Sequence, residues 1–220
     1  MTPVRLGVIG VGALALRAIL PHLAQEDVRE RVRVEAVCDP VFERARDAAA
    51  RYGIPNCYAE LDELLADESI AAVTVASPIG LHYEHCRRAL EAGKHVHVNK
   101  TMCVTVAEAD ELIDLAHARK LQIVASPGEV LRPQLRRTRE LIEQRAIGEL
   151  AWVICGGSFE SYHEQDEPER LGAPGGAAIS PAWYFRKPGG GPMYDITVYA
   201  LHQLTSVLGP ARRPAREART

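Results

Sequence analysis

The sequence predicts an α/β fold in which helices cover both faces of a parallel sheet. Short apolar segments alternate with segments of helical spacing throughout residues 1–125. Segments that alternate in this way form βαβ units, and such units build parallel sheets. The segment Ala71–Ala76 reads AAVTVA and has no polar face, which is typical of a strand buried on both sides. These observations together predict a doubly wound parallel sheet.

The individual elements follow from the period of apolar residues and from the residues that end each segment. Gly53 and Gly93 stand where two helices are expected to end, and Pro78 blocks extension of the strand before it. Thr105 and Glu108 form a capping box at the start of the longest helix. The expected strands are Val4–Ile9, Val32–Cys38, Ala71–Ala76, His95–Val98 and Gln122–Ala125. The expected helices are Ala13–Leu23, Val41–Tyr52, Leu61–Ala66, His82–Ala92 and Thr105–Lys120.

The pattern changes near residue 126, which predicts a domain over residues 1–125 and a second, incomplete α+β domain over residues 126–220. The elements expected in the second part are a helix at Pro133–Arg145, a strand at Leu150–Ile154, an acidic loop at 160–192 and a helix at Met193–Leu208. One strand cannot form a sheet. This strand therefore either joins the edge of the first sheet or lacks partners because the chain stops before them.

Composition and charge argue against several classes of protein. The chain has 220 residues, of which 47% are hydrophobic and 25% charged, unlike a disordered or low-complexity chain. The formal net charge is −3, whereas nucleic-acid binders carry a basic excess, so we expect no nucleic-acid partner. No apolar run reaches the length of a membrane-spanning helix, and a signal peptide is not expected. The five cysteines form no CxxC pair, which favours reduced thiols and a cytoplasmic location.

A glycine-rich turn follows the first strand. Gly10, Gly12 and Ala15 form a GxGxxA motif between that strand and the next helix. The first glycine permits a tight turn, the second lets the main chain approach a diphosphate, and the small third residue lets the helix pack on the strand. The diphosphate then lies at the N–H groups of a helix start. The motif predicts a Rossmann-type dinucleotide-binding domain; the alternative is that the glycines only permit a turn.

An aspartate stands at the end of the second strand. Asp39 can accept hydrogen bonds from both ribose hydroxyls of an adenosine and would repel a 2′-phosphate, so NAD is favoured and NADP is not excluded. The alternative is an aspartate that ends a strand before the turn at Pro40. Because the glycine motif precedes it, we expect Asp39 to bind the cofactor.

Four segments carry a resemblance to a known family: GVIGVGALA, AAVTVASPIGLHYEHCRRALEAGKHVHVNK, RPQLRRTRELIEQRAIGEL and GGGPMYDITVYALHQLTSVLGP. From Val4 to about Pro210 the chain resembles the glucose–fructose oxidoreductase / inositol dehydrogenase family, known as Gfo/Idh/MocA. The second segment is the most specific. Its Ser77-Pro78, His82 and Gly93-Lys94-His95-Val96 match the family's Ser/Thr-Pro, His and Gly-Lys-His-Val.

The resemblance implies a Rossmann domain followed by a domain that binds substrate and oligomerises through a large open sheet. Members usually oxidise or reduce a hydroxyl of a sugar, a sugar derivative or a cyclitol with NAD(P). The lysine of the family's Glu-Lys-Pro lies beside the nicotinamide, which places Lys100 there, and the family's remaining catalytic groups map to Asp195 and Tyr199. The resemblance also puts Ser77, Pro78, His82 and Asn99 at the cofactor.

The chain departs from the family in three places. Glu-Lys-Pro has become Asn99-Lys100-Thr101, and Tyr199 stands where the family usually has a histidine. The family also normally runs well beyond this length, so the chain looks C-terminally truncated and most strands of the second sheet are expected to be missing.

The same residues suggest chemistry without the family. Lys100 follows a strand and so emerges at the carboxyl edge of the parallel sheet, where such sheets bind ligands. Asp195, Tyr199 and His202 stand at i, i+4 and i+7, on one face of the expected helix. Alcohol oxidation needs a base for the hydroxyl proton. Tyr199 becomes one if an ammonium lowers its pKa, whereas His202 needs no such shift, so either is a candidate.

Each of these residues also has a structural interpretation. Lys100 can be a surface lysine, Asp195 can cap its helix, Tyr199 can be a core aromatic, and His202 can face solvent. His95 and His97 share a strand face, but neither a complete ligand set nor typical zinc spacing accompanies them, so no metal is expected.

The sequence therefore predicts an NAD(P)-dependent dehydrogenase or reductase of a polyhydroxylated small molecule. Lys100, Asp195 and Tyr199 or His202 would handle the proton. Two alternatives stay open: a relative that uses NAD to cleave glycosidic bonds, and a truncated, non-catalytic dinucleotide-binding protein. A homo-oligomer is possible.

Overall fold

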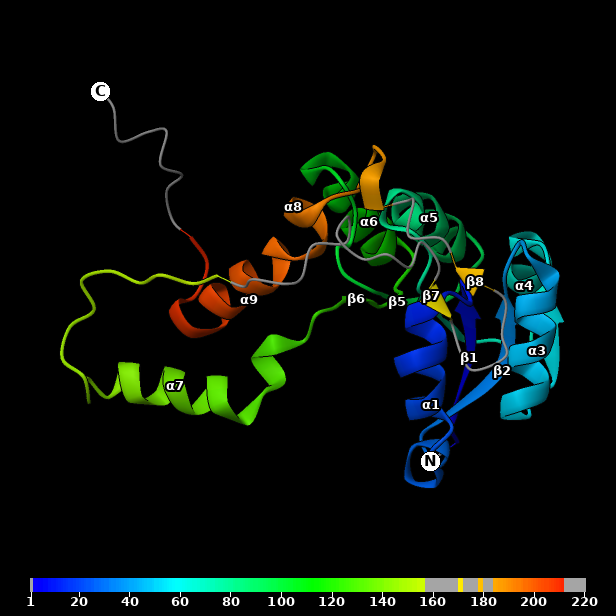
Figure 1. The fold of residues 1–220 in the computed structure, drawn as a ribbon, viewed down its shortest axis with the longest axis horizontal. Helices are drawn as coiled ribbons and strands as arrows, with labels where there is room; N and C mark the ends of the chain where they lie inside the picture. The colour runs from blue at the N-terminus through cyan, green and yellow to red at the C-terminus, as the bar shows by residue number, and fades with distance from the viewer. Residues whose placement is uncertain (1, 157–169, 172–177, 180–183, 212–220) are drawn as a thin grey trace.

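The computed structural model describes residues 2–156, 170–171, 178–179 and 184–211, and Figure 1 shows its ribbon. Six parallel strands form one sheet in the order β3-β2-β1-β4-β5-β6. This is the strand order of a doubly wound dinucleotide-binding fold, so the predicted fold class is confirmed. The strands are β1 (Val4–Ile9), β2 (Val32–Cys38), β3 (Asn56–Tyr58), β4 (Ala72–Val75), β5 (His95–Val98) and β6 (Ile123–Ala125).

Helices cover both faces of this sheet. One apolar cluster joins the sheet to α3 (Phe42–Tyr52) and to the helix after the glycine turn, and its buried members include Val8, Leu20 and Val37. A second cluster joins the opposite face to α4 (Leu61–Ala66), α5 (His82–Glu91) and α6 (Val106–Ala118). Its fully buried members include Leu64, Val73, Leu90 and Leu112. Burial on both faces explains the all-apolar strand that the sequence shows.

The helix starts and ends follow the local signals in the sequence. The helix after the glycine turn runs from residue 13 to residue 23, as predicted, with a π-helical segment η1 (Ala15–Ile19) leading into α1 (Leu20–Leu23). The short α2 (Glu26–Arg29) follows. Gly53 ends α3 in the left-handed conformation, with φ of 64°. The predicted capping box of Thr105 and Glu108 is present at the start of α6.

Beyond residue 126 the chain leaves the sheet. A 3₁₀ turn, η3 (Glu129–Leu131), leads into α7 (Pro133–Glu143), and α8 (Pro192–Asp195) and α9 (Thr197–Leu208) follow later. Figure 1 shows α7 and α9 extending away from the sheet on the side of β6. Two further segments, β7 (Arg170–Leu171) and β8 (Ala178–Ile179), pair as an antiparallel ribbon. The predicted acidic run and most of the predicted loop at 160–192 lie outside the described residues.

Two predictions for this part are wrong. Leu150–Ile154 forms no strand, because β3 and β6 are the edges of the sheet and no described strand lies beside the segment to accept its hydrogen bonds. The predicted single helix Met193–Leu208 is instead two helices that meet at Ile196, whose φ of −113° interrupts the helical path. The predicted stop at Gly209 is confirmed.

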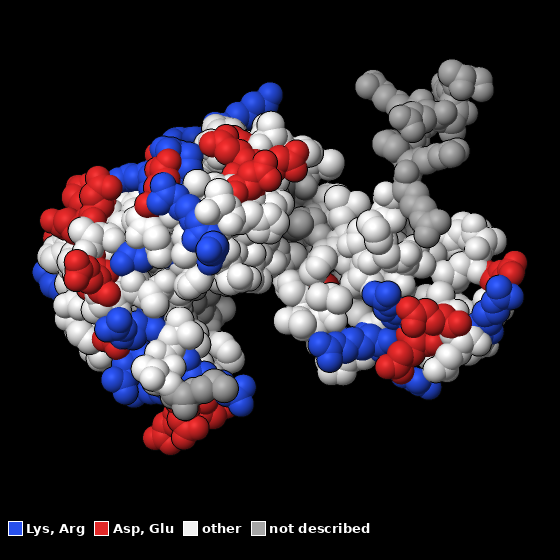
Figure 2. Space-filling model, turned by 180° about the vertical axis from the view of Figure 1, so that it is seen from behind, with Lys and Arg blue, Asp and Glu red and all other residues white. Residues whose placement is uncertain are grey.

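The surface shows mixed charge. On the face drawn in Figure 2, lysine and arginine side chains alternate with acidic ones, and a notch separates the sheet-bearing part from the part that carries α7. Within the described residues, no helix is long and apolar enough to cross a membrane.

Candidate active site

The glycine turn lies at the carboxyl end of β1 and has the geometry that the GxGxxA motif predicts. Gly10 has φ of 91°, and a Cβ there would come within 2.8 Å of the main-chain nitrogen of Ser77. Only glycine fits this position. A Cβ on Gly12 would meet no atom within 4 Å, so the turn is open where a diphosphate would approach. Ala15 is fully buried, as close packing of helix on strand requires.

Asp39 lies at the end of β2 and holds this turn in place. Its Oδ2 accepts a hydrogen bond from the main-chain N–H of Val11 at 2.9 Å, and its Oδ1 accepts one from the N–H of Val41, also at 2.9 Å. Arg44 NH1 lies 3.9 Å from Oδ1, and Asp39 as a whole is only 5% exposed. Both carboxylate oxygens thus already serve the protein's own main chain. The carboxylate acts first as a clamp between β1 and β2.

Lys100 lies just beyond β5 and meets residues almost 100 positions later in the chain. Its ammonium forms an ion pair with Asp195 and also donates to the main-chain oxygen of Asp195 at 2.6 Å. The side chains of both residues are 11% exposed. The Lys100 ammonium also lies 5.0 Å from the centroid of the Tyr199 ring, within the range of a cation–π contact. The structure therefore brings together three of the four predicted catalytic residues.

The fourth predicted catalytic residue, His202, points elsewhere. Its Nδ1 accepts a hydrogen bond from the main-chain N–H of Glu129 at 3.2 Å. Because α8 and α9 meet at Ile196, Asp195 is not on one continuous helix face with the other two residues. The alternative interpretation, in which Asp195 caps its helix, is wrong, because no side chain caps the start of α9.

The remaining residues predicted to bind the cofactor lie beyond the ends of β4 and β5, and they differ in burial and in hydrogen-bond partners. Ser77 follows β4, and its Oγ lies 2.9 Å from His85 Nδ1. Pro78 is exposed, and Asn99 is half-buried, with its main-chain N–H donating to Val75. His82 is fully buried at the start of α5, so its ring contacts protein groups on all sides. Burial lowers the pKa of His82, and the nearby Lys100 lowers it further.

Glu129 is a buried carboxylate that the sequence analysis did not identify. It is 2% exposed, pairs with Arg132 at 2.9 Å and accepts a hydrogen bond from Gln203 Nε2 at 3.0 Å. With His202, these contacts fasten α9 to η3. One signal was available, since Glu129 follows the turn at Gly128 just after β6, at the same carboxyl edge as Lys100.

The described residues offer no metal-binding group. No cluster of three or more histidine, cysteine or acidic side chains suited to a metal ion occurs among them. His95 is exposed and accepts from the N–H of Gln122, whereas His97 lies 3.0 Å from Ser126 Oγ. Burial lowers the pKa of His97, which keeps its ring neutral near pH 7.

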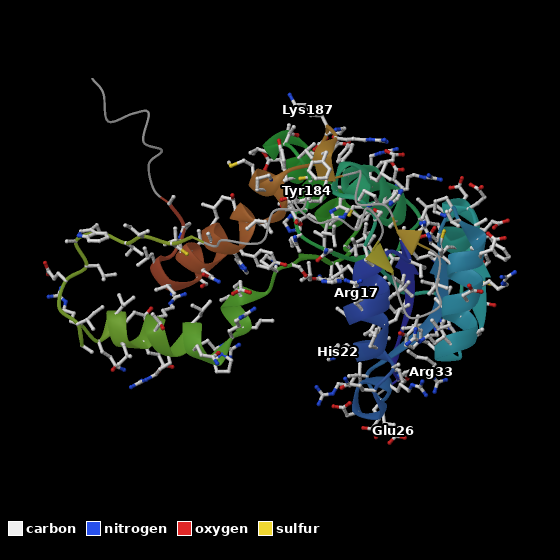
Figure 3. All side chains as sticks on the ribbon, in the orientation of Figure 1. Arg17, His22, Glu26, Arg33, Tyr184 and Lys187 are labelled. Atoms are coloured by element: carbon white, nitrogen blue, oxygen red, sulfur yellow. The ribbon has the colours of Figure 1, made fainter. Side chains whose placement is uncertain are left out.

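A cavity of about 340 Å³ lies away from these residues. It is formed by α1, the start of β2 and the segment that follows α3, including Leu20, Val34 and Ile54. Figure 3 shows Arg33, which lines the cavity, low on the sheet-bearing part, with Arg17 above it. None of the predicted site residues lines this cavity. The glycine turn and the Lys100 cluster lie instead at the carboxyl edge of the sheet, which is therefore the candidate site.

Comparison with known proteins places the chain in a family. Residues 4–126 match the model of the oxidoreductase family with an NAD-binding Rossmann fold, GFO_IDH_MocA. The chain belongs to the Gfo/Idh/MocA family. The resemblance predicted from the four sequence segments is therefore confirmed.

Several relatives of this Gfo/Idh/MocA chain carry named activities. It is 30% identical over 210 residues to D-glucoside 3-dehydrogenase of Escherichia coli, covering 94% of this chain and 55% of the relative. It is 30% identical over 209 residues to dTDP-3,4-didehydro-2,6-dideoxy-alpha-D-glucose 3-reductase of Streptomyces violaceoruber, covering 95% of this chain and 56% of the relative. The chain thus spans a little over half the length of these relatives.

A solved structure extends the likeness to the arrangement of elements. The open form of a 3-ketoreductase from Actinomadura kijaniata, in complex with TDP-benzene and NADP, matches with a TM-score of 0.72 and 27% identity. The match covers 94% of this chain and 57% of that one. The family is one of NAD(P)-dependent oxidoreductases, and the two relatives named above act on a D-glucoside and on a dTDP-linked sugar.

Proposed function

We propose that this chain belongs to an NAD(P)-dependent oxidoreductase that transfers hydride between the nicotinamide and a hydroxyl or carbonyl group of a sugar, a sugar derivative or a cyclitol. The observation that carries the proposal is the contact of Lys100 with Asp195 and Tyr199. This cluster lies at the same carboxyl edge of the sheet as the open glycine turn. Ligands of doubly wound sheets bind at that edge.

The dinucleotide fits the residues around the turn. The main chain at Gly10 and Gly12 would hold the diphosphate, because Gly12 leaves space and the N–H groups of the helix start are unpaired within the helix. Asp39 would keep the turn in shape and meet the adenosine ribose with its remaining lone pairs, and NAD is the cofactor we favour for that reason. Ser77, Pro78 and Asn99, which follow β4 and β5, would lie along the nicotinamide half.

The proton is handled by the chain's own side chains. The nicotinamide supplies or accepts the hydride when it is bound. An ammonium has three N–H donors, and Lys100 directs two of them at Asp195, so we assign the third to the substrate oxygen. Lys100 stabilises negative charge on that oxygen, and Tyr199 exchanges the proton with it. We prefer Tyr199 to His202 because only Tyr199 contacts Lys100, whereas His202 is bonded to Glu129.

The proposal also covers the domain organisation and the cellular location. Residues 1–125 would be the dinucleotide-binding domain, and residues 126–220 part of a domain for substrate binding and oligomerisation. The five cysteines are free thiols, and we infer a cytoplasmic protein from them.

A binding and turnover experiment tests the proposal. NADH and NADPH are titrated separately while nicotinamide fluorescence is followed, and turnover is then assayed on D-glucosides, cyclitols and nucleotide-linked sugars. We expect saturable binding of NADH, weaker binding of NADPH and oxidation within this panel. Absence of binding at millimolar concentrations of both coenzymes would overturn the proposal. Binding without turnover would favour the non-catalytic alternative, and sugar release without net NADH would favour glycoside cleavage.

A further inference from the structure

His82 bridges the loops that follow two neighbouring strands. Its Nδ1 lies 2.7 Å from the main-chain oxygen of Thr101, which follows β5. Its Nε2 lies 2.8 Å from the main-chain oxygen of Ser77, which follows β4. The residue is fully buried, so both ring nitrogens are turned to protein rather than to water. A single side chain thus ties together the carboxyl ends of β4 and β5.

Both loops belong to the candidate active site. Thr101 is the residue after Lys100, and its hydroxyl also donates to the main-chain oxygen of Tyr194, next to Asp195. Ser77 lies against the glycine turn, since its main-chain nitrogen is the atom that a Cβ on Gly10 would meet. The imidazole of His82 therefore lies between Ser77, which packs against the glycine turn, and Thr101, the neighbour of Lys100.

The number of N–H donors on the His82 ring decides which substitutions preserve the bridge. Main-chain oxygens only accept hydrogen bonds, and a neutral imidazole carries a single N–H. Only the doubly protonated ring donates to both oxygens, and burial opposes that form by lowering the pKa of His82. Lys100 and His85 are the titratable groups that interact electrostatically with the His82 ring. The neutral ring therefore donates one hydrogen bond, to the oxygen of Thr101 or to that of Ser77, and an apolar side chain of similar size would donate none.

We propose that His82 is a positioning residue that fixes Lys100 relative to the glycine turn. The role rests on the proposed function, because it assumes that Lys100 meets a substrate held beside the dinucleotide. His82 itself touches neither. It acts through its contacts with Thr101 and Ser77, and loss of these contacts frees the Lys100 loop while the sheet beneath stays packed.

The four lysines of the chain allow a test that needs no substrate. Lys94 is 7% exposed and donates to the main-chain oxygens of Asp67 and Ile70, so its acetylation reports general loosening of the fold. Lys120 and Lys187 are exposed and report the reagent itself. Acetylation rates of all four are measured by mass spectrometry in the wild type, in His82→Gln, whose side-chain amide still donates hydrogen bonds, and in His82→Leu, whose side chain donates none.

We expect the rate at Lys100 to rise about fivefold or more in His82→Leu, and less in His82→Gln, while the rate at Lys94 stays unchanged. The matched control is His97→Gln, which alters another partly buried histidine on β5 and should leave Lys100 as slow as in the wild type. An unchanged rate at Lys100, or a parallel rise at Lys94 and Lys100, would overturn the proposal.

A measurement on the wild type covers the case in which the variants do not fold. In protein with ¹⁵N-labelled histidine, the His82 ring should show at least one nitrogen protonated and hydrogen-bonded, and shifts of a water-exposed imidazole would refute the bridge. NADH titration of the same samples separates the two proposals. If the wild-type protein binds no dinucleotide, the proposed function is refuted. The acetylation rates of the lysines test only whether His82 fixes the position of Lys100.

Discussion

The sheet-bearing part of the chain and the part beyond residue 126 bury their apolar residues very differently. In the first part, two apolar clusters enclose the sheet, and residues such as Leu64, Leu90 and Leu112 are fully buried. In the second part, α7 has no buried residue, and Ser206 is the only buried residue of α9. Stability and cofactor binding should therefore depend on the first part, whereas the second contributes a few side chains that reach back to Lys100.

The largest effect is expected where the two parts meet, at Lys100. Lys100→Met keeps an unbranched side chain of nearly the same length but removes the charge that pairs with Asp195 and stabilises the substrate oxygen. Turnover in the sugar panel should fall by about 10²- to 10⁴-fold, the usual contribution of a positioned acid or base. NADH affinity should change little, and Lys120→Met, on the exposed surface, should leave both unchanged. A Lys100→Met enzyme with full turnover would refute the assigned role.

Truncation of leucines tests the difference in burial directly. Leu112→Ala removes a fully buried side chain of α6 and should lower the free energy of unfolding by about 2–5 kcal/mol. Leu201→Ala removes a side chain of α9 that is 57% exposed and should cost about 0.5 kcal/mol or less. Urea unfolding followed by circular dichroism measures both. Equal losses would mean that the second part is as tightly packed as the first.

The two glycines of the turn separate folding from binding within the first part. Gly10→Ala places a methyl group against the main chain at Ser77 and forces a positive φ, so stability should fall by about 3 kcal/mol. Gly12→Ala has free space around it and should leave stability nearly unchanged. Its methyl group would instead occupy the space that the diphosphate needs. NADH binding should weaken about tenfold or more, and a tenfold loss corresponds to about 1.4 kcal/mol. Unaltered NADH affinity in Gly12→Ala would argue against a diphosphate at this turn.

Acid should weaken the first part through its partly buried His85. Burial, with the neighbouring His82 and Arg88, lowers the pKa of His85 from 6.5 to about 4. Between these two values the unfolded chain binds more protons than the folded one, so stability falls as the pH falls. His85 should account for at most about 2 kcal/mol between pH 7 and pH 5. Unfolding by urea at both pH values checks this, and His85→Gln should flatten the dependence. A wild type equally stable at both would contradict the prediction.

The first part was predictable because its signals are local. The strands Val32–Cys38 and His95–Val98 and the helix Leu61–Ala66 have the predicted bounds, since apolar period and flanking turn residues define them. The strand β3 was not predicted, because three residues reading NCY carry no readable period. Local signals were sufficient wherever the partners of a segment lie in the same βαβ unit.

The candidate site was only partly predictable for a related reason. The residue types at Lys100, Asp195 and Tyr199 suggested their chemistry, but the contact among them depends on two segments 95 residues apart. The break at Ile196, which separates Asp195 from the helix that carries Tyr199 and His202, has no glycine or proline to announce it. The contacts of His82 are with main-chain oxygens, which every residue possesses, so no sequence pattern could have revealed them.

A small effect on stability, but a large one on association, is expected at the exposed segment after α7. Trp152 is 74% exposed and Ile154 is 82% exposed, and both stand where the sequence has the apolar character of a strand. Clustered exposed apolar side chains promote association. The wild type should therefore self-associate at high concentration in sedimentation velocity, and Trp152→Ser with Ile154→Ser should reduce this.

The same double substitution should change the free energy of unfolding by about 0.5 kcal/mol or less, because these side chains bury little in the chain. The control is Val106→Ser, which removes a single apolar side chain, 77% exposed, from the sheet-bearing part and should not alter association. A wild type that stays monomeric at high concentration would show that the exposed segment is not adhesive. In that case the contrast in burial between the two parts would have no consequence for assembly, and only their unequal contributions to stability would remain.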